Sequence, residues 1–223
     1  MLQTRTIEPD TLGLLKALMS KPYLSHYYLV GGTALALQLG HRFSIDLDLF
    51  THIKIDRNLW INQLKEDFDV QIEVDSPIFF ITYINGVKVD FVNVPYLPTH
   101  PMIEIQDVRL LDIQDIAPMK LNAITQRGSK KDFYDIFYLF KKIKLDDMLK
   151  AYEEKLKIQN AFQVLKSLTY FADADERNGY QYFFKNDITS LVISSDNSGK
   201  ILYGSLIIRK YVLFSYSAID FEW

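Results

Sequence analysis

The sequence of 223 residues contains no cysteine. It can therefore form neither a disulfide framework nor a metal site with thiolate ligands, and this composition fits a reducing cytosol. The four histidines are scattered along the chain and do not suggest a histidine metal triad. Any metal site predicted from this sequence must use oxygen ligands.

Long apolar stretches are also missing. No run of about 18 apolar residues could cross a bilayer, and the most apolar late stretch, residues 201–214, is interrupted by Gly204, Arg209 and Lys210. The N-terminal residues contain no apolar segment typical of a signal peptide. We therefore expect a cytoplasmic protein without a membrane partner.

Positive charge is not in excess over the whole chain. The formal net charge is −3 and the isoelectric point is about 5.8, which argues against a globally basic nucleic-acid-binding protein. The segment from Lys120 to Lys144 differs, because it contains seven lysines and arginines but only two aspartates. This local excess predicts a groove for an RNA acceptor, although a lysine-rich helix end in solvent has the same pattern.

Periodicity predicts an α/β (α+β) fold in which a mixed sheet with flanking helices is followed by a mainly helical part. We place the boundary after residue 98, with a catalytic domain at 1–98 and a helical domain at 99–223. The helical domain ends in a tail from about residue 187 that has strand-like patterning. Asn85-Gly86 lies between two apolar runs, which is a strong hairpin signal. Expected strands cover 27–30, 44–50, 70–74, 78–84 and 87–94, and expected helices cover 33–39, 57–67, 116–127, 130–144 and 145–168.

The stretch YLVGGTALALQLGHRFSIDLDLF, residues 28–50, contains two aspartates within a strand pattern. Side chains at i and i+2 on a strand point the same way, so Asp46 and Asp48 should lie side by side. Two ionised carboxylates at that distance repel each other unless a cation or a proton joins them. Oxygen ligands favour Mg²⁺ or Mn²⁺. An ordinary half-exposed strand with polar residues facing water is the alternative.

Gly31, Gly32 and Thr33 follow a short apolar strand and open a helix. Glycines at this place let a phosphate approach the backbone, and the N–H groups at the helix start attract anions. The same arrangement often forms only a tight turn. Together with the nearby carboxylate pair, it indicates a nucleotide phosphate site.

A third carboxylate, Asp90, lies within the apolar run GVKVDFVNV. An aspartate among valine and phenylalanine is costly unless it is paired or bound to a metal. The alternative is a charge on an edge strand that faces solvent. We predict that Asp46, Asp48 and Asp90 form the metal site and that Arg42, just before the strand, steers phosphate or lies in a solvated turn.

This order of motifs resembles the nucleotidyltransferase superfamily of DNA polymerase beta. The stretch quoted above and DIAPMKLNAITQRGSKKDFYDIFYLF, residues 115–140, together resemble the AbiEii/AbiGii abortive-infection family over about residues 10–175. The resemblance implies that Asp46, Asp48 and Asp90 bind metal and act in catalysis. It also implies that Gly31, Gly32 and Thr33 hold the β- and γ-phosphates.

A later motif of the family has Lys, Arg and then Lys-Asp-x-x-Asp, which matches Lys120, Arg127, Lys131, Asp132 and Asp135. The resemblance implies that Lys120 reaches the triphosphate, that Lys120 and Asp135 act in catalysis, and that Arg127, Lys131 and Asp132 help to bind the nucleotide. Asp132 also fits a capping box with Ser129. Asp135 has no such structural role, so we expect it to be functional and paired with Lys120 or Arg127.

The implied reaction is the transfer of NMP from an NTP to an acceptor hydroxyl, with Mg²⁺ or Mn²⁺ and with release of pyrophosphate. The resemblance further implies a toxin of a toxin–antitoxin system, with tRNA or other RNA as acceptor and a cognate antitoxin as partner. Two alternatives remain open. One is a transferase for a small hydroxylated molecule such as an aminoglycoside, and the other is a non-catalytic nucleotide-binding module.

Overall fold

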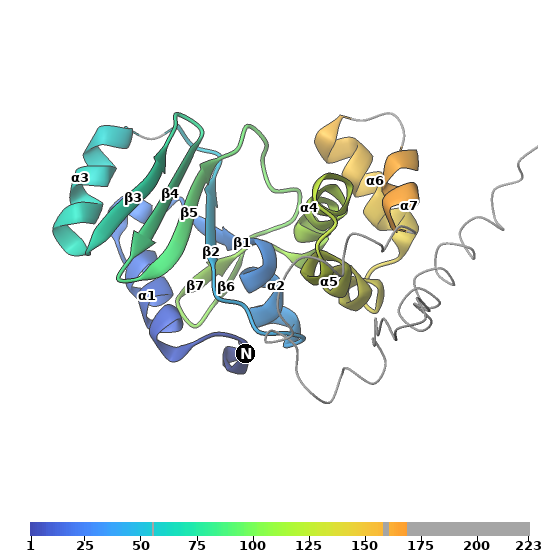
Figure 1. Cartoon of the computed structure of the whole chain (residues 1–223), viewed down its shortest axis with the longest axis horizontal. Coiled ribbons are helices and arrows are strands. Elements are labelled where there is room, and N and C mark those ends of the chain that lie inside the picture. The colour runs from blue at the N-terminus through green and yellow to red at the C-terminus, as the bar shows by residue number, and fades with distance from the viewer. Residues whose placement is uncertain (55, 158–160, 169–223) are drawn as a thin grey trace, which may run out of the picture. The chain divides into compact units, whose positions relative to one another are not determined.

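The computed structural model describes residues 1–54, 56–157 and 161–168 (Figure 1). The chain divides into two compact units, Met1–Ile116 and Ala117–Trp223. The expected strand-like tail from about residue 187 lies outside the described residues. No helix within the described ranges is both long and apolar enough to cross a membrane.

The first unit is built on a seven-stranded mixed sheet with the order β3-β4-β5-β2-β1-β7-β6. Its strands are β1 (Tyr28–Val30), β2 (Leu47–Thr51), β3 (Val70–Asp75), β4 (Phe79–Ile84), β5 (Val87–Asn93), β6 (Ile103–Ile105) and β7 (Val108–Leu110). Its helices are α1 (Pro9–Met19), α2 (Gly31–Leu39) and α3 (Arg57–Asp67), with short 3-10 turns at Thr4–Thr6 and Pro22–Leu24. The predicted mixed sheet with flanking helices is confirmed.

Local turn signals position several of these elements. Asn85 and Gly86 have φ angles of 50° and 81°, which suit the two-residue turn of a tight hairpin, and they join β4 to β5 as predicted. Gly40 has a φ of 69° and its N–H donates to the carbonyl of Ala36, so it ends α2.

Long-range pairing adds two strands that follow the expected boundary at residue 98. The β6–β7 hairpin joins the sheet because β7 runs parallel to β1, with Leu29 opposite Leu110. The backbone N–H of Leu111 also donates to the carbonyl of Leu29. The compact first unit therefore extends to Ile116 and includes these strands.

The buried face of the sheet carries an aromatic cluster under α3. Trp60 of α3 lies 5.0 Å from Phe91 and 5.5 Å from Phe80, measured between ring centroids. Tyr27 contacts Phe91 edge to face at 5.3 Å. Aromatic pairs at these separations add to the free energy gained from burial. The cluster fixes the central strands that carry the carboxylates on their other face.

The described part of the second unit, residues 117–157 and 161–168, is helical, as predicted. It contains most of α4 (Ile113–Gln126), followed by α5 (Lys130–Phe140), α6 (Leu145–Leu156) and α7 (Phe162–Leu168). The predicted single helix from 145 to 168 was wrong, because α6 ends at Leu156 and the next residue, Lys157, has a φ of 54° that cannot continue a helix. Nearly all of α5 is buried, including both of its aspartates.

Candidate active site

The turn from β1 into α2 brings the backbone close to a carboxylate. Gly31 has a φ of 69°, and a Cβ atom placed on it would lie 2.2 Å from Oδ2 of Asp48. A Cβ atom on Gly32 would lie 2.1 Å from an Nη atom of Arg42. Both distances are far below any normal contact, so a side chain at either position would displace the Asp48 carboxylate or the Arg42 guanidinium. The predicted glycine turn is therefore formed directly beside Asp48.

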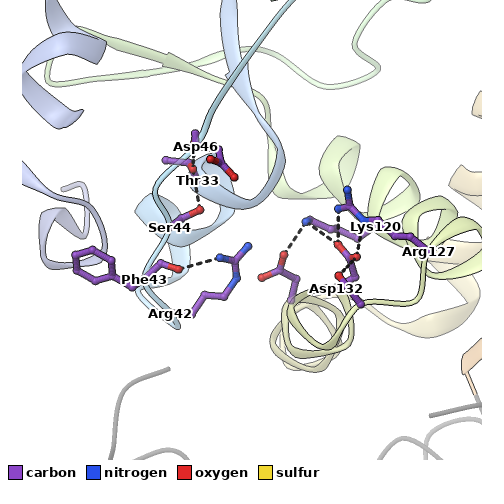
Figure 2. A network of polar contacts seen from close by, with 10 residues as sticks. Thr33, Arg42, Phe43, Ser44, Asp46, Lys120, Arg127 and Asp132 are labelled. Carbon is purple, nitrogen blue, oxygen red and sulfur yellow. Dashed lines mark hydrogen bonds and ion pairs between the residues drawn. The ribbon is translucent and has the colours of Figure 1, made fainter. Parts of the chain in front are cut away.

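Arg42 is buried, with only 4% of its surface exposed. Its Nη1 donates to the carbonyl of Phe43 at 2.9 Å, as Figure 2 shows. The alternative of a charge in a solvated turn is therefore wrong, because the side chain is shielded from water. A buried guanidinium next to a helix start places positive charge beside the glycine turn.

A small hydrogen-bond network positions Asp46. The hydroxyl of buried Thr33 lies 2.8 Å from the hydroxyl of Ser44 and is also bonded to the carbonyl of Asp46 (Figure 2). A carbonyl can only accept, so the single Thr33 hydrogen goes to Asp46 and Ser44 donates to Thr33. Thr33 therefore holds the backbone of Asp46, and its predicted contact with phosphate stays a prediction.

The strand predicted for residues 44–50 begins later than expected. β2 starts at Leu47, so Asp46 lies just before the strand and only Asp48 lies within it. The carbonyl of Asp46 accepts a hydrogen bond from the side chain of Thr33.

Asp48 and Asp90 are direct neighbours on adjacent parallel strands. The register of β2 and β5 places Leu47 opposite Val89, Asp48 opposite Asp90 and Leu49 opposite Phe91. The leucines, Val89 and Phe91 are buried, so the two aspartates lie on the other face of the sheet. Two carboxylates thus meet beside the glycine turn.

Lys88, two residues before Asp90 on β5, places its ammonium at this carboxylate site. Its Nζ lies 3.4 Å from Oδ2 of Asp90. Burial lowers the pKa of Lys88, but the carboxylates of Asp90, Asp46 and Asp48 outweigh that effect and raise it. All three predicted metal ligands therefore act on the same ammonium group.

The pKa of Asp90 is shifted toward its neutral form, whereas that of Lys88 is shifted toward its charged form. Burial raises the pKa of Asp90, Lys88 lowers it, and the nearby carboxylates of Asp46 and Glu73 raise it again, so that the pKa lies above its ordinary value. One lysine does not offset the burial and the negative charge around Asp90. This carboxylate is therefore poorly stabilised without additional positive charge.

Within residues 1–54, 56–157 and 161–168, no three acidic or histidine side chains already enclose a site for an ion. The residues nevertheless fit a divalent cation with a preference for oxygen ligands. Oδ1 of Asp90 is buried, and no hydrogen-bond donor of the described residues reaches it. A buried carboxylate oxygen without a donor is costly, and a bound cation would satisfy it.

The second unit contains a buried cluster of two positive and two negative side chains. Lys120, 5% exposed, has its Nζ 2.7 Å from Oδ2 of Asp135 and 3.3 Å from Oδ1 of Asp132. Arg127 binds Asp132 through two nitrogens, Nε at 2.8 Å and Nη2 at 2.9 Å (Figure 2). The predicted pairing of Asp135 with Lys120 is confirmed.

Asp132 does not complete the predicted capping box. The Ser129 hydroxyl donates to the Asp132 carboxylate and caps no backbone N–H, because Arg127 and Lys120 draw that carboxylate into the ion-pair cluster. Burial alone would raise the pKa of Asp132. The hydrogen bonds from Arg127 and Ser129, together with the charge of Lys120, outweigh burial and lower the pKa below its ordinary value.

The cluster has an exposed end and a buried end. The Arg127 side chain is 52% exposed although Asp132 is fully buried. Lys131 is exposed and takes part in none of the ion pairs identified in the described part of the chain. The predicted residues Lys120, Arg127, Asp132 and Asp135 therefore form one assembly, and Lys131 lies outside it.

Sequence reasoning assigned no role to Lys88 or Ser44. Strand alternation already places Lys88 on the same side of β5 as Asp90, so its proximity could have been found. No local signal indicates that Ser44 is buried against Thr33.

Known proteins share both the sequence and the fold of this chain. The family model of the nucleotidyl transferase AbiEii toxin, type IV toxin–antitoxin system, matches residues 13–191. A protein of Aquifex aeolicus, described only as uncharacterized, is 32% identical over 194 residues, covering 77% of this chain and 86% of the relative.

Two solved structures share the architecture. A candidate nucleotidyltransferase from H. pylori superposes with a TM-score of 0.52 at 17% identity, covering 96% of this chain and 100% of the other. The nucleotidyltransferase toxin MenT4 of Mycobacterium tuberculosis gives a TM-score of 0.52 at 15% identity, covering 94% of this chain and 83% of the other. At these identities the structures show a shared fold, and the family model carries the assignment. The chain belongs to the AbiEii family of nucleotidyl transferase toxins of type IV toxin–antitoxin systems.

Proposed function

We propose that this protein uses a divalent cation, Mg²⁺ or Mn²⁺, to transfer NMP from an NTP to an acceptor hydroxyl, and that Asp46, Asp48 and Asp90 hold the cation. The observation that supports this most is the direct pairing of Asp48 with Asp90 beside the Gly31 turn. When bound, the cation would neutralise triphosphate charge and polarise the phosphorus that is attacked.

The chain's own residues have separate tasks in this proposal. The backbone N–H groups of Gly31 and Gly32, at the start of α2, receive the β- and γ-phosphates. Arg42 adds positive charge at the same turn. Asp90, whose pKa lies above its ordinary value, accepts the proton of the acceptor hydroxyl. The phosphorus–oxygen bond to pyrophosphate breaks as the bond to the acceptor oxygen forms.

The second unit contains the Lys120, Arg127, Asp132 and Asp135 cluster. Its two positive and two negative charges cancel, so the cluster attracts a triphosphate only weakly while all of its ion pairs are formed. We propose that Arg127, whose side chain is half exposed, makes the nucleotide contact and that Lys120 and Asp135 hold the cluster in place. Lys131 adds positive charge at the surface of α5, the helix that carries Asp135.

We propose RNA, with tRNA as the first class to test, as the acceptor. Lys120 and Arg127 of the basic segment are used in the internal ion pairs, but Lys131, Lys141, Lys142 and Lys144 are exposed. Lys141, Lys142 and Lys144 follow the C-terminal end of α5, and a group of exposed lysines suits a phosphate backbone. Lys141 also lies 4.1 Å from the ring centre of Tyr138, which leaves an aromatic group at the same surface. The cognate antitoxin is the expected protein partner.

Incubation with each α-labelled NTP, Mg²⁺ and total tRNA tests this proposal. We expect label in a nuclease-sensitive product, and no label with the Asp46→Ala/Asp48→Ala/Asp90→Ala variant after circular dichroism has shown that it folds. Label in a nuclease-resistant small product would replace RNA by a small-molecule acceptor. Nucleotide binding without transfer to any acceptor would favour a non-catalytic module.

A further inference from the structure

Lys88 lies against the carboxylates of the first unit's candidate metal site. It lies on β5, two positions before Asp90, and both side chains extend from the same face. Nζ is 3.4 Å from Oδ2 of Asp90, and the two side chains are 35% and 22% exposed. The ammonium is therefore partly shielded from water and directed at a proposed metal ligand.

We propose that Lys88 is a resident counter-ion that stabilises the carboxylate site before the metal binds and competes with the metal for it. This inference rests on the metal site of the proposed function. It makes Lys88 a positioning residue, which acts through the carboxylates and touches neither the nucleotide nor the acceptor.

Charge balance supports the proposal. Asp46, Asp48 and Asp90 bring three negative charges together, and Asp48 and Asp90 are adjacent in register. Without a cation these groups repel each other, and the Lys88 ammonium offsets part of that repulsion. A divalent cation at the same carboxylates would repel the ammonium in turn. The ammonium and the cation therefore weaken each other's interaction with the Asp90 carboxylate.

The geometry leaves room for such an exchange. Lys88 contacts Oδ2 of Asp90, whereas Oδ1 is buried and no donor in the described part of the chain reaches it. The lysine therefore contacts only one of the two carboxylate oxygens of Asp90. Its flexible four-carbon stem is about a third exposed, so the ammonium can move into solvent without disturbing the sheet.

Direct Mn²⁺ binding to the full chain, followed by the electron paramagnetic resonance signal of free Mn²⁺, tests this without an activity assay. We expect Lys88→Met to bind Mn²⁺ about three- to tenfold more tightly than wild type, as fits a partly exposed ion pair. Lys88→Arg keeps the charge and should stay near wild type. Lys65→Met, the same exchange at an exposed lysine on α3, should leave binding unchanged.

The outcomes separate this inference from the proposed function. If wild type binds Mn²⁺ and Asp90→Asn does not, but Lys88→Met matches wild type, the metal site holds and the counter-ion role is overturned. Weaker binding by Lys88→Met overturns it as well. If wild type binds no Mn²⁺, the proposed metal site and the inference both fail. Lys88→Gln serves as a second neutral variant if Lys88→Met does not fold. The second measurement is the rise in melting temperature on addition of saturating Mn²⁺, which we expect to be larger for the neutral variant than for wild type.

Discussion

Asp48 on β2 lies directly opposite Asp90 on β5, and its carboxylate fills the space that a side chain at Gly31 would need. This relationship joins the glycine turn to the carboxylate pair. A change at the turn must therefore affect the position of the carboxylates, even when the carboxylates themselves are kept.

Gly31→Ala tests the link between the turn and Asp48. The positive φ alone should cost about 1–2 kcal/mol of the free energy of unfolding. The methyl group would also push Asp48 away, so Mn²⁺ binding and label transfer should both be lost. Gly86→Ala is the matched control, because its φ is 81° but a Cβ atom there would meet nothing within 4 Å. Equal effects on Mn²⁺ binding in the two variants would contradict the link.

Thr33→Val tests whether the Thr33 hydroxyl positions Asp46. Valine has nearly the same shape but leaves the Asp46 carbonyl and the Ser44 hydroxyl without their partner, which should cost roughly 1–3 kcal/mol of stability. Label transfer should fall with it, whereas Thr33→Ser should keep most of both. Urea unfolding and the transfer assay measure the two effects. A stable Thr33→Val variant with full activity would exclude this role.

Lys120→Met tests the buried ion-pair cluster. Removing the lysine leaves Asp132 and Asp135 buried with less compensation, and the loss of one partner of a buried pair costs about 3–5 kcal/mol. The double variant Lys120→Met/Asp135→Leu should be more stable than the sum of the single changes by roughly 0.5–3 kcal/mol. Lys131→Met, at an exposed lysine on α5, should change stability by less than about 0.5 kcal/mol. Additive losses in urea unfolding would show that Lys120 and Asp135 are not coupled.

The lowered pKa of Asp132 predicts a pH dependence of stability. A carboxyl group whose folded pKa lies below its unfolded value of about 3.9 stabilises the fold above that value, and the stabilisation is lost as pH falls through the folded pKa. Stability should therefore decline below about pH 4 in wild type, and less steeply in Asp132→Asn. Thermal unfolding between neutral and acidic pH measures this. Parallel curves for the two proteins would contradict the assignment.

Local patterns in the sequence predicted the parts of the fold that depend on neighbouring residues. The hairpin at Asn85-Gly86 and the glycine turn before α2 were both recognised from the backbone conformations that glycine and asparagine favour. The helical second unit followed from apolar periodicity. The family motifs matched Lys120, Arg127, Asp132 and Asp135, which the structure joins in one cluster.

Long-range pairing could not be predicted in the same way. The parallel register that sets Asp48 against Asp90 depends on β2 and β5, which are about forty residues apart, and the β6–β7 hairpin joins the sheet only through β1. Arg42 is buried, and its guanidinium lies close to Gly32. These features are set by tertiary packing, which local propensity does not record.

The most direct test of the central claim is label transfer from an α-labelled NTP by wild type and by Asp48→Asn, each with Mg²⁺ and total tRNA. Asp69→Asn, at an exposed aspartate between α3 and β3, is the control for the substitution itself. If Asp48 and Asp90 form the metal site, Asp48→Asn should lose at least about a hundredfold in rate and Asp69→Asn should keep it. Transfer by Asp48→Asn at the wild-type rate would contradict the account.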